Sequence, residues 1–341
     1  MTLSRFAAIS VASLWVIGCG GESNLSTPQG SSRLGSSTAA LSSGVTTIAT
    51  FNRFTEGLAV DRNGNFYVGF YYRGVIHKVA ADGTQSTFAT LPVGTLGGGL
   101  VGLGVDEDGD VYACLASYDS NQGIWKVSAD GSQQQQIAAL DPAGFPNGLA
   151  IDAHSIFVTD STLGQVWRIS RDTLAVEVFS KGPLLAPPDP LGDRVGSFGA
   201  NGIQIDDGAL WVTNTSKGLI ARIDLDARGS HDAQLWLQSD QLIGADGNAF
   251  DEDHNQYIAN DGLEDVSTAN TIMKVYPNKQ FEVLFPQNAG LDFPASVAFG
   301  QSSDSRRDLF WTNGGFNFGI KSLMEGNVGE KGVRLPVRNT R

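Results

Sequence analysis

The stretch Asn147-Gly148-Leu149-Ala150-Ile151-Asp152 belongs to a set of six related stretches that recur along the 341-residue chain. After a turn, each is followed by a second apolar stretch, here Ile156-Phe157-Val158-Thr159, and then by a third, here Val166-Trp167-Arg168-Ile169. Apolar and polar residues alternate within them, a pattern typical of β-strands rather than helices. The six units begin at Glu56, Val101, Asn147, Asn201, Asp246 and, more weakly, Ala295.

Successive units begin 45, 46, 54, 45 and 49 residues apart. Repeats of this length predict an all-β fold, a six-bladed β-propeller of four-stranded blades. Each blade would have an inner strand A, two middle strands B and C, and an outer strand D. The segment from Val45 to Phe51 precedes the first inner strand. We expect it to complete the last blade, because ring closure removes an exposed strand edge. One propeller domain is therefore expected over residues 45–341.

The composition agrees with short strands and tight turns. Glycine accounts for 42 residues, and only 17% of residues are charged, which argues against a helical bundle or a disordered chain. Asp and Glu (36) outnumber Lys and Arg (23), so the net charge is −13. A nucleic-acid-binding protein is expected to show a basic face. No run of Lys or Arg occurs in the sequence, and we expect no nucleic-acid partner.

Residues 1–18 are expected to form a lipoprotein signal peptide. An apolar run from Phe6 to Gly18 follows Arg5; it is too short to span a bilayer and fits a signal-peptide core. Cys19 follows this run, in a context that resembles the cleavage site of bacterial lipoproteins. The alternative is an ordinary secretory signal with an incidental cysteine. Gly20, rather than Asp, favours the outer membrane by the lipoprotein sorting pattern, so we expect an envelope lipoprotein facing the periplasm or the cell surface.

Residues 19–44 are rich in Ser, Gly and Thr and predict a flexible tether. The mature chain would keep Cys114 as its free thiol, within an expected strand, where a buried and inert cysteine is the simplest interpretation. No disulfide within the chain is expected if Cys19 is lipidated. We expect a monomer held at the membrane by the lipid anchor.

The residues that open the six inner strands are expected to form a ring around the propeller axis. Because the strands of a blade run antiparallel, these residues all lie at the same end of the domain. Four of them carry oxygen donors: Glu56, Asn147, Asn201 and Asp246. Asn-Gly and Asp-Gly are also common turn dipeptides, but Glu56 occupies the same register and is a poor turn former. Two carboxylates and two amides suit a hard cation, Ca²⁺ best and Mg²⁺ next.

These repeats and ring residues resemble the senescence marker protein/gluconolactonase/regucalcin family, which is related to paraoxonases and diisopropyl fluorophosphatases. The resemblance covers all six repeats. It implies a calcium ion in the central channel, held by Glu56, Asn147, Asn201 and Asp246. Paraoxonases carry a catalytic histidine at the blade 2 position, where this chain has Val101, so a histidine mechanism is not expected. The four histidines fall in turns of the other face or within a C strand.

The resemblance implies a calcium-dependent hydrolase of lactones or related esters and phosphoesters, acting on a small-molecule substrate. Asp246 is expected to be the catalytic residue, as general base for water or as nucleophile. Two other readings stay open from the sequence: a ligand-binding propeller in which a metal only stiffens the channel, and a lyase. Propellers host unrelated functions, so the fold does not decide between them.

Further polar residues end the B strands on the same face, where they could contact the metal-binding residues or substrate, or equally cap turns: Asp160, Asn214, Asn260, Asp261 and Asn313. Two long connections on that face, residues 182–200 and 261–271, are expected to wall a pocket. The acidic stretches at Asp106 and Asp251 resemble calcium loops but lack the final Glu of an EF-hand, and we interpret both as A-to-B turns.

The substitution Cys19→Ala tests the anchor. It should abolish lipid attachment, so that the protein disappears from the detergent-extracted lipoprotein fraction while wild type stays in it. Mass spectrometry of the wild-type N-terminus should find an acylated Cys19. A free N-terminus at another cleavage site would contradict the lipoprotein prediction.

Overall fold

The computed structural model describes residues 44–94, 98–189, 197–226, 230–262, 270–302 and 305–328. Apart from Gly44, the predicted signal peptide (1–18) and tether (19–44) lie outside the described residues. None of the helices in the described ranges has the length and apolar character needed to cross a bilayer.

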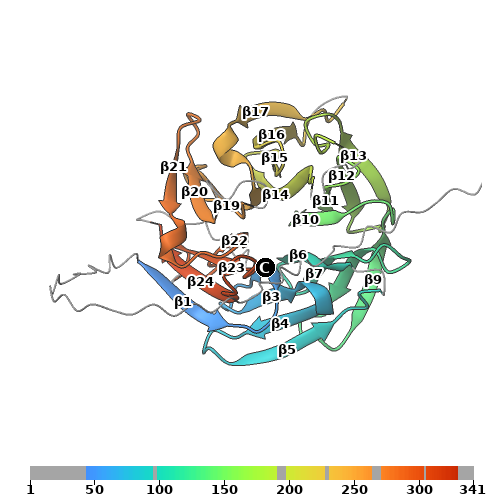
Figure 1. The fold of residues 1–341 in the computed structure, drawn as a ribbon. Helices are drawn as coiled ribbons and strands as arrows, with labels where there is room; N and C mark the ends of the chain where they lie inside the picture. The colour runs from blue at the N-terminus through green and yellow to red at the C-terminus, as the bar shows by residue number, and fades with distance from the viewer. Residues whose placement is uncertain are drawn as a thin grey trace, which may run out of the picture. The chain divides into compact units, whose positions relative to one another are not determined.

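Six four-stranded antiparallel sheets are arranged around a central opening, which confirms the predicted six-bladed propeller (Figure 1). The first three blades follow the chain in order, with strands β2 (Thr55–Val60), β3 (Phe66–Phe70), β4 (Val75–Val79) and β5 (Gln85–Thr90); β6 (Gly99–Val105), β7 (Val111–Ala116), β8 (Gly123–Val127) and β9 (Gln134–Ala139); β10 (Pro146–Ile151), β11 (Ser155–Asp160), β12 (Gln165–Ser170) and β13 (Val176–Lys181).

The other three blades repeat the arrangement and close the ring. Their strands are β14 (Ala200–Asp206), β15 (Ala209–Asn214), β16 (Leu219–Asp224) and β17 (Gln234–Gln238); β18 (Ala245–Phe250), β19 (Gln256–Asn260), β20 (Thr271–Val275) and β21 (Phe281–Phe285); β22 (Pro294–Phe299), β23 (Asp308–Asn313), β24 (Ser322–Asn327) and β1 (Val45–Thr50). Three short 3-10 turns, η1 (Tyr71–Arg73), η2 (Asp240–Leu242) and η3 (Gln287–Ala289), lie in connections.

Strand β1 is the outer strand of the last blade, as predicted. It pairs antiparallel with β24, from Val45 opposite Gly326 to Thr50 opposite Ser322, and Figure 1 shows the blue N-terminal strand beside the red C-terminal one. This pairing covers the backbone edge that β24 would otherwise expose. Beginning and end of the domain are thus joined in one sheet.

The hydrophobic core is divided among the six contacts between neighbouring blades. Each buried cluster draws side chains from two adjacent blades; Ile156 and Val158 of blade 3, for example, pack against Tyr112 and Cys114 of blade 2. Cys114 is fully buried there, and burial raises its thiol pKa, which keeps the sulfur protonated and inert. Each blade is a sheet with two faces, and each face is covered by a neighbouring blade. The ring must therefore be complete for every blade to bury both of its faces.

Ring closure gives a prediction about truncation. A chain that begins at Phe51 lacks β1, which removes five paired residues, the buried Ala49 among them, from the last blade. We expect its melting temperature to fall by about 5 °C or more relative to a chain that begins at Gly44, together with self-association through the uncovered β24 edge. Differential scanning calorimetry and light scattering measure both effects. Equal stability of the two chains would contradict the role assigned to β1.

Candidate functional site

The four oxygen-bearing residues of the predicted ring lie around one small cavity on the axis. Glu56, Asn147, Asn201 and Asp246 line a space of about 40 Å³, together with Val101 and Ala295 from the equivalent positions of blades 2 and 6. Asn147, Asn201 and Asp246 are each 5% exposed. The end of the propeller at which these inner strands begin is called the site face below.

A bulge at the same place in every blade positions these residues. In blade 3, Pro146 pairs with Asp160 and Leu149 with Val158, so that Asn147 and Gly148 together oppose the single residue Thr159. The other five blades show the same irregularity between inner strand and neighbour. Bulges bend a strand and re-aim its side chains. The sequence repeat predicted the shared register of these residues but not the bulge.

The second bulge residue is glycine in five blades because neighbouring inner strands approach too closely for a side chain. A Cβ atom on Gly102 would lie 2.3 Å from the carbonyl oxygen of Asn147, and one on Gly202 would lie 2.2 Å from that of Asp246. Contacts this short are not tolerated by a Cβ. The glycine after five of the six ring residues is therefore a packing requirement of the ring, and Ser296 of blade 6 is the exception.

Hydroxyl groups hold the two amides in one orientation. Asn147 donates through Nδ2 to Ser161 Oγ (3.1 Å), and Ser161 Oγ donates to the carbonyl of Ala200 in the next blade (2.7 Å). Asn201 repeats the arrangement with Thr215 (2.9 Å), which donates to Ala245 (3.0 Å). With both amide nitrogens engaged, the amide oxygens remain as the acceptors available at the cavity. The order of oxygen and nitrogen in each amide follows from this network.

Threonines of the B strands fix the backbone of three ring residues. Thr312 Oγ1 donates to the carbonyl of Glu56 (2.6 Å), and Thr213 Oγ1 donates to that of Asp246 (2.8 Å). Thr159 makes the same hydrogen bond to Asn201. Each bond crosses from one blade to the next and originates from the residue opposite the bulge. These threonines are visible in the sequence repeat, but nothing in the sequence indicates that their partners lie in the following blade.

Asp246 is buried and Glu56 is half-buried, and no described side chain that lines the cavity supplies a compensating cation. Burial, with the negative charge of Asp261, raises the pKa of Glu56 to about 8. Burial also raises the pKa of Asp246 well above its usual range, with further contributions from Glu56 and Asp261; a hydrogen bond from Asn201 opposes the rise. The cavity therefore favours a bound positive charge or bound protons.

Asp261 is a third buried carboxylate at this site, 3% exposed. It follows β19 and occupies the register held by Ser161 and Thr215 in blades 3 and 4. The sequence placed it among the polar residues that end the B strands, with contact to the metal-binding residues, contact to substrate and turn capping left open. The structure brings its charge close enough to raise the pKa values of Glu56 and Asp246.

The donor set fits a hard cation by its chemistry. Asn201 Oδ1 is buried and has no hydrogen-bond partner among the described residues, and such an orphaned acceptor costs about 1–3 kcal/mol unless something binds it. Across the described residues, no group of three or more His, Cys, Asp or Glu side chains is arranged to hold a metal. A cation here would therefore depend on the two amides as much as on the two carboxylates, which favours Ca²⁺ over Zn²⁺.

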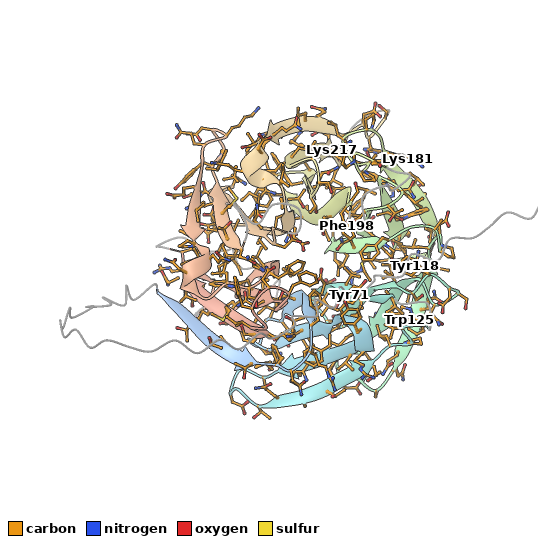
Figure 2. The ribbon with its side chains drawn as sticks, in the orientation of Figure 1. Tyr71, Tyr118, Trp125, Lys181, Phe198 and Lys217 are labelled. Atoms are coloured by element: carbon orange, nitrogen blue, oxygen red, sulfur yellow. The ribbon has the colours of Figure 1, made fainter. Side chains whose placement is uncertain are left out.

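Aromatic side chains stand around the site. Tyr71 follows β3 and lies close enough to Glu56 and Tyr118 for their charges to raise its pKa, although burial is the larger cause. Figure 2 shows Tyr71 and Phe198 nearer the centre than Trp125 and Lys181. Ring contacts connect a first cluster of Phe54, Tyr71, Tyr72, Phe293 and Phe316, and a second of Tyr118, Phe145 and Phe198.

A buried carboxylate holds the loop that carries the exposed aromatic residue Phe318. Asp292 is fully buried and accepts hydrogen bonds from the backbone N–H groups of Asn317 (2.8 Å), Phe318 (2.9 Å) and Ile320 (2.8 Å). Phe316 precedes this anchored segment, is 62% exposed and contacts Phe54 and Phe293. The long connection 182–200 is likewise tied down in its described part, because Asn214 Nδ2 donates to the carbonyls of Leu184 and Ala186. Most of the connection 261–271 lies outside the described residues.

The histidines lie where the sequence placed them. His154 and His254 follow inner strands on the far side of the ring, His231 precedes β17, and His77 is within β4. None of the four lines the small cavity, and Val101 stands at the blade 2 position. The stretches at Asp106 and Asp251 are turns, as predicted: Asp106 Oδ1 accepts from the backbone N–H groups of Asp108 and Asp110.

Comparisons with known proteins give the following matches. No family model matches the chain. It is 25% identical over 219 residues to lactonase drp35 of Staphylococcus saprophyticus subsp. saprophyticus, a match that covers 60% of this chain and 62% of the lactonase. The chain thus spans less than two thirds of the length of that relative.

Two solved structures show the same fold. Regucalcin of Agrobacterium tumefaciens, described as a calcium-binding protein, has a TM-score of 0.61 at 16% identity, covering 85% of this chain and 95% of that one. A gluconolactonase of Xanthomonas campestris has a TM-score of 0.60 at 15% identity, covering 83% and 89%. With the lactonase match, these names confirm the resemblance to the senescence marker protein/gluconolactonase-like family that the ring residues indicated.

The raised pKa values predict how protons and calcium compete. At pH 7, which is below the Glu56 pKa of about 8, the Glu56 carboxyl is mainly protonated, and the pKa of Asp246 is raised as well. Calcium binding should therefore release about one proton or more per ion and tighten as the pH rises toward 8. Calorimetric titrations of metal-free protein in PIPES and imidazole buffers give the proton count from the difference in heat. Asn147→Ala and Asn201→Ala should weaken binding but keep the proton release, whereas Glu56→Gln should reduce it. Affinity that is independent of pH between 6 and 9 would contradict this account.

Proposed function

We propose that this propeller, which resembles the senescence marker protein/gluconolactonase/regucalcin family, is a calcium-dependent hydrolase of lactones or related esters and phosphoesters. The observation that carries the proposal is the convergence of Glu56, Asn147, Asn201 and Asp246 on one buried cavity. A lactonase activity of the curated relative, as its name states, supports the reaction class. Mg²⁺ is the second choice of ion on the same donor chemistry.

In this proposal Glu56, Asn147 and Asn201 bind the ion, and Asp246 both binds it and handles a proton. A bound calcium would supply a Lewis acid that polarises the scissile carbonyl or phosphoryl group and stabilises negative charge on its oxygen. Asp246 removes a proton from water as the water oxygen attacks the carbonyl carbon. The C–O bond of the lactone then breaks, and the proton passes to the leaving alkoxide, which gives the hydroxy acid. In the alternative form, the Asp246 carboxylate itself attacks and water later releases the acyl group.

The scaffold residues keep these groups in place. The hydroxyls of Ser161 and Thr215 orient the two amides, and Thr213 holds the backbone of Asp246. Because these contacts exist before substrate binds, the donors need not reorganise when charge develops. Asp261 maintains a negative potential that favours a divalent ion over a monovalent one.

The aromatic clusters favour substrates with an apolar part. Exposed aromatic residues at Tyr72 (58%) and Phe316 (62%) offer ring faces next to the site, and such residues bind aryl and alkyl groups through apolar contact. Substrate screening should therefore include aryl lactones and aryl esters beside sugar lactones. Activity on any of these that is lost with EDTA and restored by calcium supports the hydrolase. Calcium binding without turnover in such a screen would favour the ligand-binding propeller.

We also propose that the mature protein is a monomeric lipoprotein of the bacterial cell envelope, anchored at Cys19 and joined to the propeller by residues 19–44. The apolar run before Cys19 supports the anchor. In that location the substrate is a small molecule of the periplasm or the cell exterior.

The substitution Asp246→Asn separates binding from chemistry. It keeps an oxygen ligand but removes the base, so turnover should fall by ~10²-fold or more even at saturating calcium. Activity of the wild type should persist below pH ~6.5, because the nearby cation lowers the pKa of a ligating carboxylate. His254→Gln serves as the control and should leave the pH profile unchanged. Near-normal turnover of Asp246→Asn in excess calcium would refute the assignment.

A further inference from the structure

A second and larger cavity opens on the opposite face of the channel. It has a volume of about 380 Å³ and is lined by the middle of all six inner strands. The two cavities share the ring of small residues Gly102, Gly148, Gly202, Gly247 and Ser296, and otherwise have different linings. A volume of this size lies in the range of pockets that bind small molecules.

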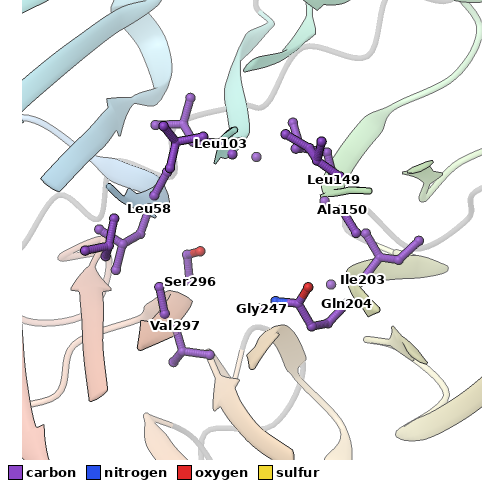
Figure 3. A pocket seen from close by; sticks show the side chains of 18 of the residues that line it. Leu58, Leu103, Leu149, Ala150, Ile203, Gln204, Gly247, Ser296 and Val297 are labelled. Carbon is purple, nitrogen blue, oxygen red and sulfur yellow. The ribbon is translucent and has the colours of Figure 1, made fainter. Parts of the chain in front are cut away.

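At the level of Asn248 the wall of this cavity is apolar except at one position, whereas Gln204, Gln301 and the charged residues of the mouth make the rest of the lining polar. Five blades contribute a branched apolar side chain, and Figure 3 shows them around the opening: Leu58, Leu103, Leu149, Ile203 and Val297. The sixth equivalent position is Asn248. Its register is the same, because Asn248 pairs with Ile258 as Leu149 pairs with Val158. A single amide thus interrupts an otherwise apolar ring.

The amide of Asn248 is buried and unsatisfied. Asn248 is 5% exposed, and neither its Nδ2 nor its Oδ1 has a hydrogen-bond partner in the part of the chain that the structure describes. Such a group destabilises the folded protein, and a leucine at this position would not. The other amides of the lining differ, since Gln204 accepts from Ile205 N (3.1 Å) and Gln301 donates to the carbonyl of Phe299 (3.4 Å).

The charges at the mouth bear on what can enter. Asp61, Asp106 and Glu107 line it, together with Arg62. Asp61 already accepts from Asn63 N, Asn65 N and the Asn65 side chain, and Arg171 pairs with Asp106 at 2.8 Å. The remaining potential is not positive, so the mouth offers no attraction for an anion.

We propose that this cavity is a second binding site for an uncharged small molecule that has an apolar part and presents a carbonyl oxygen and an N–H or O–H side by side, such as a primary or cis amide. Asn248 forms two hydrogen bonds with that group, one through Oδ1 and one through Nδ2. The apolar body packs against the branched side chains of the other blades. The site lies beyond the glycine ring and is independent of the proposed hydrolase activity.

Benzamide serves as the probe, and N,N-dimethylbenzamide, which has no N–H, is the matched control ligand. Calorimetry on the full-length protein should give a dissociation constant of about 1 mM or lower for benzamide and a value ~10-fold higher for the control. Asn248→Leu gives blade 5 the leucine that blades 1, 2 and 3 carry at the equivalent position. It should weaken benzamide binding ~10-fold or more and remove the preference for benzamide over its dimethyl derivative.

Two further measurements make the outcome decisive. Asn248→Leu should raise the melting temperature by about 2 °C or more, because it removes the unsatisfied amide. Asp246→Asn, on the other side of the glycine ring, should bind benzamide as wild type does, which separates this site from the proposed active site. The proposal is overturned if benzamide does not bind at about 10 mM, if wild type does not distinguish the two ligands, or if Asp246→Asn abolishes binding. The two-ligand comparison needs no variant and stands even if Asn248→Leu fails to fold.

Discussion

Six inner strands converge on one axis, and in five of the six neighbouring pairs the distance leaves no room for a Cβ atom beside the ring carbonyl. This constraint explains the glycines that follow Glu56, Val101, Asn147, Asn201 and Asp246. It also explains why each inner strand carries a bulge against its own blade, since an added residue bends the strand as it reaches the axis. The arrangement holds six side chains at one level of the channel.

Burial of charge is the consequence of that convergence. Glu56 and Asp246 line one small cavity. Burial raises the pKa values of both carboxyl groups, and the negative charge of Asp261 raises them further. The desolvation of two carboxylates is unfavourable, and the protein retains it only because the blade-to-blade contacts stabilise the ring as a whole. The hydroxyls of Ser161, Thr213 and Thr215 then fix which atoms face the cavity. Stability is supplied by the apolar contacts between blades, and the polar ring is free to serve binding.

The sixfold repeat also shows where the chain departs from symmetry. At the level of the ring residues, blades 2 and 6 carry Val101 and Ala295 instead of oxygen donors, so the oxygen donors are distributed unevenly around the axis. Two residues after each ring residue the imbalance is reversed, because Asn248 is polar where the other five blades carry an apolar residue. Positions of equal geometry with unequal chemistry are where a propeller places specific contacts, because packing alone would permit the same residue in every blade.

The sequence by itself determined the number of blades, the strand that closes the ring and the register that Glu56, Asn147, Asn201 and Asp246 share. These features follow from period-2 alternation and from a sequence repeat that occurs six times in the chain. The tertiary structure alone decided which residues meet across blades: Thr312 with the carbonyl of Glu56, Ser161 with that of Ala200, and the field of Asp261 with both ring carboxylates. The physical reason is that a repeat fixes the neighbours within one sheet, whereas contacts between sheets depend on the curvature and bulges that bring the inner strands to one axis.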